Sequence, residues 1–469
     1  MAKSRARRTK TLSGSFTVPP IIDRLPPETL AEIFSIQPPR CLKLPPRSTP
    51  SGTDVRTQSP WNLASVCRQW RDIAFSTPRL WSSFDVSVDS APHPRLITTL
   101  QLFLGRSGNH PLTFKLHAPK DVPRSTFQQA MSSFVQRAGQ WEDVTFTFAL
   151  NLLSECTCLQ QPDICFPQLL DLDIWCYSHI PHEELQLPAF QLFARASLLS
   201  QLGLERFSYP PSILHLPWHQ ITYLSMNLND GGVEWLLDIL EYTSNLSALD
   251  FNATNPRANL QPRTRGILEL SHLRKLVWSC RFMFDDSAFF NHISAPLLTN
   301  LTLECSDWRH SAVQGFLQRS ACSVTHVTLT AESSDEFRSF LGLFPDAEQL
   351  SVSATSGDFS LTEALTVCEE NSAMTRVCPK LQRLNLHRME TKQDEESRSA
   401  FVEMVKSRFR GCEGLGGAGA VAKLESLRIF HYQHGSASGD KIARLYRILQ
   451  ERLSPNELEL VHHQFVSRS

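Results

Sequence analysis

The sequence predicts an α/β protein in which a small N-terminal helical unit precedes a solenoid of strand–helix repeats. Three observations support this fold class. An apolar pattern, L-x-x-L-x-L, recurs along most of the chain at intervals of about 22 to 30 residues. Segments with helical spacing of apolar residues lie between its copies. Two short amphipathic helical patterns precede the first copy, between residues 25 and 81.

Composition places the chain among folded, intracellular proteins. Of its 469 residues, 41% are apolar and 20% charged, and the net charge of −1 gives no overall field toward nucleic acid or an anionic membrane. No apolar run approaches the roughly 18 residues of a membrane span. The basic segment Met1–Lys10 lacks the apolar core of a secretory signal. The twelve cysteines are therefore expected as reduced thiols in the cytoplasm or the nucleus.

Residues 1–20 are polar and basic, which predicts a disordered tail. Arg5–Lys10 fits either such a tail or a weak nuclear import signal. Neither reading contributes to the fold.

The helical unit, residues 21–81, opens with a helix. Two prolines occupy its first positions, where a missing N–H costs nothing, and Glu28 suits the positive end of the helix dipole. Leu30, Ile33 and Phe34 then fall on one face. An amphipathic helix is therefore expected to start here.

A second helix is expected after Asn62, which is suited to be its N-cap. Its apolar positions at helical spacing are Leu63, Val66, Trp70, Ile73 and Ala74. Between the two helices, residues 37–60 form a long insert rich in Pro, Ser, Thr and Arg, which predicts a flexible linker.

Two helices of this size cannot bury a self-sufficient core, so periodicity alone makes them a helical cap on a larger domain. The exact residue patterns of the two helices carry more information than their periodicity. The patterns L-P-x-E-x-L-x-x-I-F, V-C-R-x-W-R-x-I-A and P-x-L-W follow one another in this order. This combination resembles the F-box, and closely that of F-box-like proteins of mushroom-forming fungi. The resemblance covers about sixty of the 469 residues.

The resemblance implies docking onto the Skp-type adaptor of a cullin–RING ubiquitin ligase. The matching positions, which face the adaptor or hold the helices together, are Leu25, Pro26, Leu30, Ile33, Phe34, Val66, Cys67 and Trp70. The family's link between the helices is shorter than the insert 37–60, so the packing of the helices does not follow from the resemblance.

Residues 82–465 are expected to form the solenoid. The middle residues of the successive pattern copies are Val144, Leu172, Leu202, Leu224, Leu249, Leu276, Leu301, Val327, Leu350, Leu384 and Leu427. Phe84–Val88 and Leu112–Leu116 are expected as entry strands. Helical patterns between the strands include residues 233–241, 311–319, 335–344, 397–408 and 441–453. One strand and one helix cannot bury their apolar faces alone, so the repeats must stack.

This part resembles the leucine-rich repeats that commonly follow an F-box. No asparagine ladder follows the strands. A generic α/β repeat with irregular curvature therefore stays open as an alternative.

Three groups of residues are of the types that bind metals or take part in catalysis. The first is Cys156, Cys158, Cys165, Cys176, His179 and His182, whose spacing is not that of paired zinc ligands. The Gly-rich segment 411–420 follows a helix and precedes a strand, the reverse of a phosphate-binding loop. The third is His431, His434, His462 and His463, which lack an accompanying nucleophile or carboxylate. No enzyme, cofactor or metal site is predicted.

Strand residues beside and between the inward positions are expected on the open, concave face. Early strands place there Asp143, Asp171, Asp173, Trp175, Glu205 and Tyr223, and late strands His326, Arg383, Asn385, His387, Arg428 and Phe430. The face would thus change from acidic to basic along the array. It is either a solvated polar face or a docking surface for a protein target of opposite polarity. The candidate target-binding residues are Trp175, Tyr223, Arg383, His387, Arg428 and Phe430.

The expected function is that of a substrate-recognition subunit of an SCF-type ligase, which forms no bonds itself and raises the effective concentration of a target near the ubiquitin donor. Two alternatives remain. One is a repeat scaffold without a role in ubiquitination. The other is an enzyme with a cryptic site, which a deep concave pocket with converging titratable groups would reveal.

Overall fold

The structure is a computed structural model of the 469-residue chain. It describes residues 22, 25–36, 42–44, 60–88, 95–119, 122–148, 152, 156–160, 163–176, 193–206, 215–228, 233–253, 266–280, 287–305, 310–331, 337–354, 362, 364–367, 377–387, 395–410, 421–432 and 447–466. The predicted tail 1–20, the Gly-rich segment 411–420 and His179, His182 and His434 lie outside the described residues.

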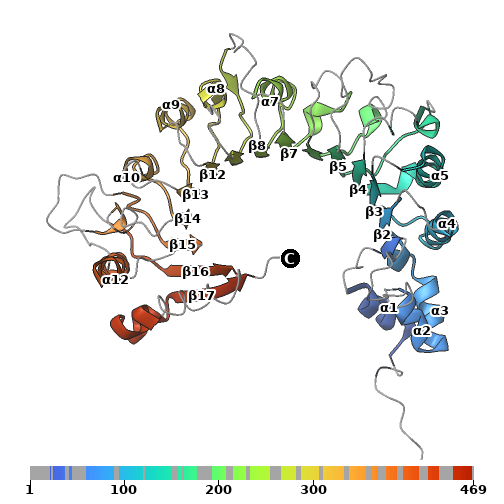
Figure 1. Ribbon diagram of the computed structural model, residues 1–469, viewed down its shortest axis with the longest axis horizontal. Coiled ribbons are helices and arrows are strands. Elements are labelled where there is room, and N and C mark those ends of the chain that lie inside the picture. The colour runs from blue at the N-terminus through green and yellow to red at the C-terminus, as the bar shows by residue number, and fades with distance from the viewer. Residues whose placement is uncertain are drawn as a thin grey trace, which may run out of the picture.

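Among the described residues, fifteen strands form one parallel sheet that curves into an open ring, with the strands on the inner side and helices on the outer side (Figure 1). The strands of this sheet are β1 (Leu42–Leu44), β2 (Ser83–Ser87), β3 (Leu112–Ala118), β4 (Trp141–Phe148), β5 (Asp171–Cys176), β6 (Gln201–Glu205), β7 (Tyr223–Leu228), β8 (Ala248–Ala253), β10 (Lys275–Cys280), β12 (Asn300–Cys305), β13 (His326–Ala331), β14 (Gln349–Ala354), β15 (Arg383–His387), β16 (Ser426–Tyr432) and β17 (Val461–Val466). Each strand pairs with the next in this order, and β9 (Leu268–Glu269) and β11 (Ile293–Ser294) pair separately.

The helical unit at the N-terminal end of the ring contains α1 (Pro27–Ile36), α2 (Trp61–Val66), α3 (Arg68–Ser76) and the 3-10 helix η3 (Pro78–Trp81). The other α-helices are α4 (Leu96–Arg106), α5 (Arg124–Val135), α7 (Val233–Leu240), α8 (Ser287–Phe290), α9 (His310–Ser320), α10 (Phe337–Leu341), α12 (Glu395–Arg410) and α14 (Pro455–Leu458). Further 3-10 helices are η4 (Ala138–Gln140), η5 (Thr157–Gln160) and η9 (Trp218–Gln220). The predicted fold class is confirmed.

The repeats stack because their strands pair in register. Leu249 of β8 lies opposite Leu276 of β10, which lies opposite Leu301 of β12. Equivalent apolar residues therefore form continuous columns beneath the outer helices, where they are buried. Each repeat buries its apolar side chains against those of the neighbouring repeats, which is how a one-dimensional array gains stability.

The end of the helical unit and the first repeats share the same local arrangement of a tryptophan and the preceding helix. Trp81 ends η3 and its indole Nε1–H donates to the Ala74 carbonyl at 2.7 Å. Trp141 follows η4, and its Nε1–H donates to the Phe134 carbonyl at 3.0 Å. In both cases a buried tryptophan satisfies a carbonyl at the end of the preceding helix. The last turn of the helical unit thus serves as the entry turn of the first repeat.

The insert 37–60 contributes to the sheet, so the prediction of a plain linker is wrong for part of it. Leu42–Leu44 forms β1, which pairs in parallel with β2 from Leu42 opposite Phe84 to Leu44 opposite Val86. Strand β2 would otherwise present its open backbone edge, and β1 occupies that edge. Apart from β1 and Pro60, the insert lies outside the described residues.

The other end of the array also extends beyond the predicted copies. Strand β17 pairs with β16 from Leu427 opposite Val461 to Tyr432 opposite Val466. His462 and His463, two of the four histidines without an accompanying nucleophile, are strand residues of β17. Its V-H-H-Q-F-V sequence lacks the leucine spacing, which is why the repeat pattern missed it.

Helix α12 is attached to the array through Arg408, whose side chain is 2% exposed. Its Nε donates to the Leu365 carbonyl at 2.6 Å, and Nη1 donates to the Cys378 carbonyl at 3.0 Å. Nη2 donates to the Val377 carbonyl at 2.7 Å. Burial lowers the pKa of Arg408. One guanidinium therefore satisfies three carbonyls from two separate segments.

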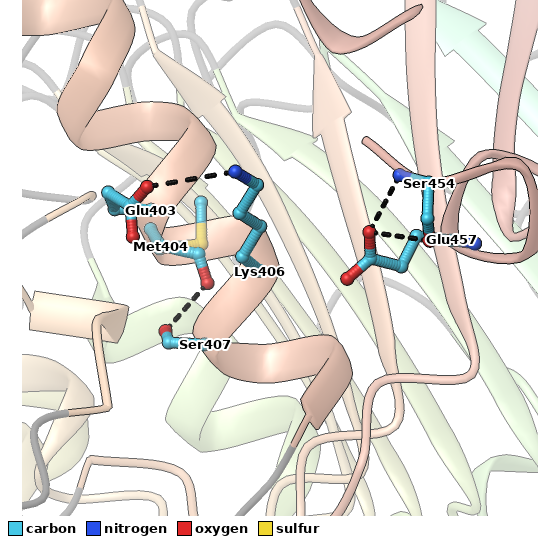
Figure 2. Close-up of polar contacts among 6 residues, drawn as sticks. All are labelled: Glu403, Met404, Lys406, Ser407, Ser454 and Glu457. Carbon is cyan, nitrogen blue, oxygen red and sulfur yellow. Dashed lines mark hydrogen bonds and ion pairs between the residues drawn. The ribbon is translucent and has the colours of Figure 1, made fainter. Parts of the chain in front are cut away.

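Local hydrogen bonds complete this region (Figure 2). On α12, Lys406 Nζ forms an ion pair with Glu403 Oε1 at 3.9 Å. The Ser407 hydroxyl donates to the Met404 carbonyl at 2.8 Å. Helix α14 opens with a capping box, in which the Ser454 N–H donates to Glu457 Oε2 at 2.8 Å. The Glu457 N–H donates back to Ser454 Oγ at 3.4 Å. Such reciprocal bonds satisfy N–H groups that have no partner within the helix.

None of the described helices is both long enough and apolar enough to span a bilayer.

Candidate functional site

Helix α1 buries one side of its apolar face. Leu30 is fully buried, and Phe34 is 5% exposed with its ring 4.8 Å from the ring of Trp70 on α3. Of the two roles expected for the F-box positions, facing the adaptor or holding the helices together, the burial of Leu30 and Phe34 favours the second. They hold α1 against the rest of the helical unit, because α3 and η3 pack on this side of the helix.

The second predicted helix is two helices that meet at Cys67. Cys67 has an extended backbone, and its Sγ accepts the Trp70 N–H at 3.4 Å as the N-cap of α3. Arg71 Nε donates to the Ala64 carbonyl at 3.0 Å across the break. Cys67 thus has a structural role, and Trp70 and Leu25 are partly buried packing residues.

Three large apolar side chains on helices α1 and α2 are exposed. Ile33 is 39% exposed, Ile36 is 76% exposed and Val66 is 60% exposed. Pro26 is also exposed. Sequence reasoning missed Ile36, although it follows Ile33 at helical spacing. Of the predicted adaptor-binding residues, Pro26, Ile33 and Val66 are the exposed ones, and their contact with an adaptor stays a prediction.

The second surface is the concave side of the sheet, where alternate strand residues form columns across the array. Asp143 of β4 lies opposite Asp171 of β5, and Asp173 lies opposite Gly203 of β6. The Asp173 carboxylate covers Gly203 so closely that a Cβ there would lie 1.8 Å from Oδ1. The absence of a side chain at Gly203 thus leaves the space that the Asp173 carboxylate occupies.

The carboxylates of β4 to β8 have raised pKa values. Burial, followed by the charges of Asp173 and Asp143, raises the pKa of Asp171 to about 6. Burial also raises the pKa values of Asp143 and Asp173, against the opposing charge of Lys115. Glu205 and Asp250 have pKa values raised mainly by burial. Asp250 was missed by sequence reasoning, although its place between Leu249 and Phe251 in the repeat marks it as concave.

We expect Asp171→Asn to stabilise the fold at high pH and not at low pH. The folded chain retains a proton on Asp171 between the ordinary aspartate pKa of 3.8 and about 6, where the unfolded chain has lost it. Ionisation within this window therefore lowers stability as pH rises. The midpoint of thermal unfolding of the variant should exceed the parent's by about one degree or more near pH 8 and converge with it near pH 4.

The exposed Asp163 provides a control for this measurement, since Asp163→Asn should leave the midpoint unchanged at both pH values. Equal midpoints of Asp171→Asn and the parent at both pH values would contradict the expectation.

Trp175 and Tyr223 accompany these carboxylates. Trp175 is 42% exposed and lies between Thr147 of β4 and Glu205 of β6. Tyr223 lies opposite Gln201 and is partly buried, and burial raises its pKa. This end of the concave face combines negative charge with aromatic surface.

The other end, on β15 and β16, carries positive charge. Arg383 and Arg428 are exposed on these adjacent strands. The rings of His387 and Phe430 stack at 4.3 Å with an interplanar angle of 4°. Asn385 is buried and donates to Ser351 Oγ at 2.9 Å, so it braces the sheet. Strands β4 and β5, which carry acidic residues, lie across the central space of the ring from strands β15 and β16 (Figure 1).

The cysteines weighed as metal ligands are only partly brought together. Cys156 Sγ lies 3.2 Å from Cys158 Sγ, and this contact raises the pKa of Cys156 and lowers that of Cys158. Cys165 is exposed, while burial in the core raises the pKa of Cys176 to about 12. Among the residues that the structure describes, no three His, Cys, Asp or Glu side chains are grouped to hold a metal ion.

Comparison with known proteins gives a family for the N-terminal part. A family model described as F-box-like matches residues 22–87, which include α1 to α3, η3 and the whole of β2. No curated protein matches the chain. Among solved structures, the chain is similar to a leucine-rich-repeat protein of Leptospira interrogans, with 11% sequence identity and a TM-score of 0.29. That similarity covers 83% of this chain and 91% of the other.

Proposed function

From the premise that residues 22–87 form an F-box-like domain, we propose that the chain is a substrate-recognition subunit of an SCF-type cullin–RING ubiquitin ligase. The observation that carries this proposal is the family match, because F-box domains generally bind Skp-type adaptors. The exposed Ile33, Ile36 and Val66 on its helices support it, since they leave apolar area for a partner to cover.

In this role the chain performs no chemistry of its own. The F-box-like domain binds the adaptor, and the repeats bind a protein target. Tethering raises the effective concentration of a target lysine near the ubiquitin donor carried by the ligase. Co-elution of the full chain with a purified Skp-type adaptor in size-exclusion chromatography tests the first step, and separate elution would contradict the proposal.

We propose that the target lies on the concave face with its charges matched to the two ends of the array. A basic part of the target would face Asp171, Asp173 and Trp175, and an acidic part would face Arg383 and Arg428. Charge complementarity across an interface sets orientation and association rate more than affinity. The two ends of the face would thus select one orientation of the target.

Arg383→Glu with Arg428→Glu is expected to weaken target capture about tenfold or more, because two attractive charges become repulsive. The measurement is affinity capture by the full chain from a cell extract, with quantitative identification of the bound proteins. The adaptor in the same eluate is the internal control, because its surface lies on the helical unit. Capture of every protein at the parent's level by the folded variant would contradict a role for this end of the face.

A repeat scaffold without a role in ubiquitination is the alternative function. The two differ in what happens to captured proteins. In cells that carry an adaptor-binding-deficient variant, targets of a ligase subunit accumulate, whereas partners of a scaffold keep their levels.

A further inference from the structure

Arg106, the last residue of α4, places its guanidinium among three aromatic rings of the F-box-like domain. Its Cζ lies 4.9 Å from the ring centre of Trp61 on α2 and 3.9 Å from that of Phe75 on α3. It lies 4.3 Å from the ring centre of Trp81 at the end of η3. One cation from the first helix of the repeats thus contacts all three elements that follow the insert.

Three aromatic rings lie within 4.9 Å of this charge. Arg106 Nη1 is buried and has no hydrogen-bond partner among the described residues. Burial lowers the pKa of Arg106. A cation over several aromatic faces is attracted by their quadrupoles, and most strongly where water is excluded. A cation at this position is therefore attracted by each of the three rings.

The same rings continue into the core of the repeats. The ring of Trp81 lies 5.3 Å from that of Trp61 and 4.9 Å from that of Phe103 on α4. Phe103 lies 6.3 Å from Phe84 of β2. The chain also crosses between the two parts more than once, because β1 joins the sheet before α2 and α3 return to the helical unit. Across the continuously described residues 60–88, no linker separates the F-box-like domain from the array.

We infer that Arg106 is a positioning residue that holds the adaptor-facing helices in one orientation relative to the concave face. This inference rests on the proposed function for its biological meaning. Binding the adaptor and a target with one chain raises the effective concentration of the target only where the geometry allows both to bind at once. Variable orientation between the two binding sites reduces this effect. Arg106 would then influence the transfer of ubiquitin to a target without contacting that target.

Distance measurement between spin labels tests the orientation directly in the full chain. Labels are attached to keto amino acids at the exposed positions Glu32 on α1 and Gln201 on β6, which avoids the native cysteines. The parent should give one narrow distance distribution. Arg106→Met keeps the apolar volume and removes the charge, and its distribution should be about twofold broader or more. Arg106→Lys, which keeps a cation among the rings, should restore most of the narrow width.

Arg79→Met is the matched control, since Arg79 is exposed on η3 and its change should leave the width unaltered. A parent-like width in Arg106→Met would overturn the inference. Loss of the native circular dichroism in both Arg106 variants would also overturn it, because Arg106 would then be required for folding and not for orientation. Neither outcome depends on adaptor binding, so a failure of the proposed function would be seen separately, as a parent chain that does not bind the adaptor.

Discussion

Replacing Ile33 and Val66 together by aspartate is expected to abolish binding of the chain to a Skp-type adaptor. Both side chains are exposed, at 39% and 60%, and each would be covered in the complex. Loss of one large apolar anchor in an interface costs about 2 kcal/mol, so the pair should cost about 4 kcal/mol, or roughly a thousandfold in affinity. The aspartate charges add a cost of desolvation. Titration calorimetry with the purified adaptor measures the effect.

Ile267→Asp is the matched control, because Ile267 is 59% exposed on the array, far along the chain from the helical unit. It should bind the adaptor as the parent does. Binding of the Ile33→Asp, Val66→Asp chain within about threefold of the parent would refute adaptor docking through this surface. Leu30→Asp would be a poor test, since Leu30 is fully buried and its charge would disrupt the helical unit itself.

Arg408→Met is expected to destabilise the C-terminal repeats by about 3 kcal/mol, because three buried carbonyls would lose their donor. The aliphatic part of the side chain is kept, so the loss falls on hydrogen bonding. Hydrogen–deuterium exchange should become faster in α12 and in residues 377–380, while α4 and α5 exchange as before. Repeat arrays are stabilised mainly by neighbouring interfaces, so a local effect is expected.

Arg410→Met provides the control for this prediction, because Arg410 is exposed and lies in the same helix two residues further on. Its exchange pattern should match the parent's. Unchanged protection of α12 in Arg408→Met would mean that packing alone holds this helix.

Local spacing predicted much of the fold. A strand places alternate residues on opposite faces, so Leu172 and Ile174 could be assigned to the core and Asp173 to the concave side from their order alone. The F-box patterns likewise marked α1 and α3 by their residue types and spacing. Charge on the concave face followed from the same alternation, since Asp171, Asp173 and Arg428 occupy exposed phases of their strands.

Spacing alone does not show which residues of an apolar helix face are buried and which stay exposed. Spacing puts Leu30 and Ile33 on one apolar face, but only the packing of α3 and η3 against α1 leaves Leu30 buried and Ile33 exposed. The short strand β1 lies in a Pro-rich insert that carries no strand pattern, and it exists because β2 offers an unpaired edge.

Residue spacing and residue type were enough to predict the type of each repeat, its inward and outward residues and the F-box-like nature of the N-terminal unit. Those properties depend on neighbours within a few positions of the chain. Which apolar side chains stay exposed depends on packing between elements, and so does the pKa of Asp171, which burial and the neighbouring carboxylates raise to about 6. The partners of Arg106 and Arg408 also depend on the fold, because the rings and carbonyls around these cations come from segments many residues away in the chain.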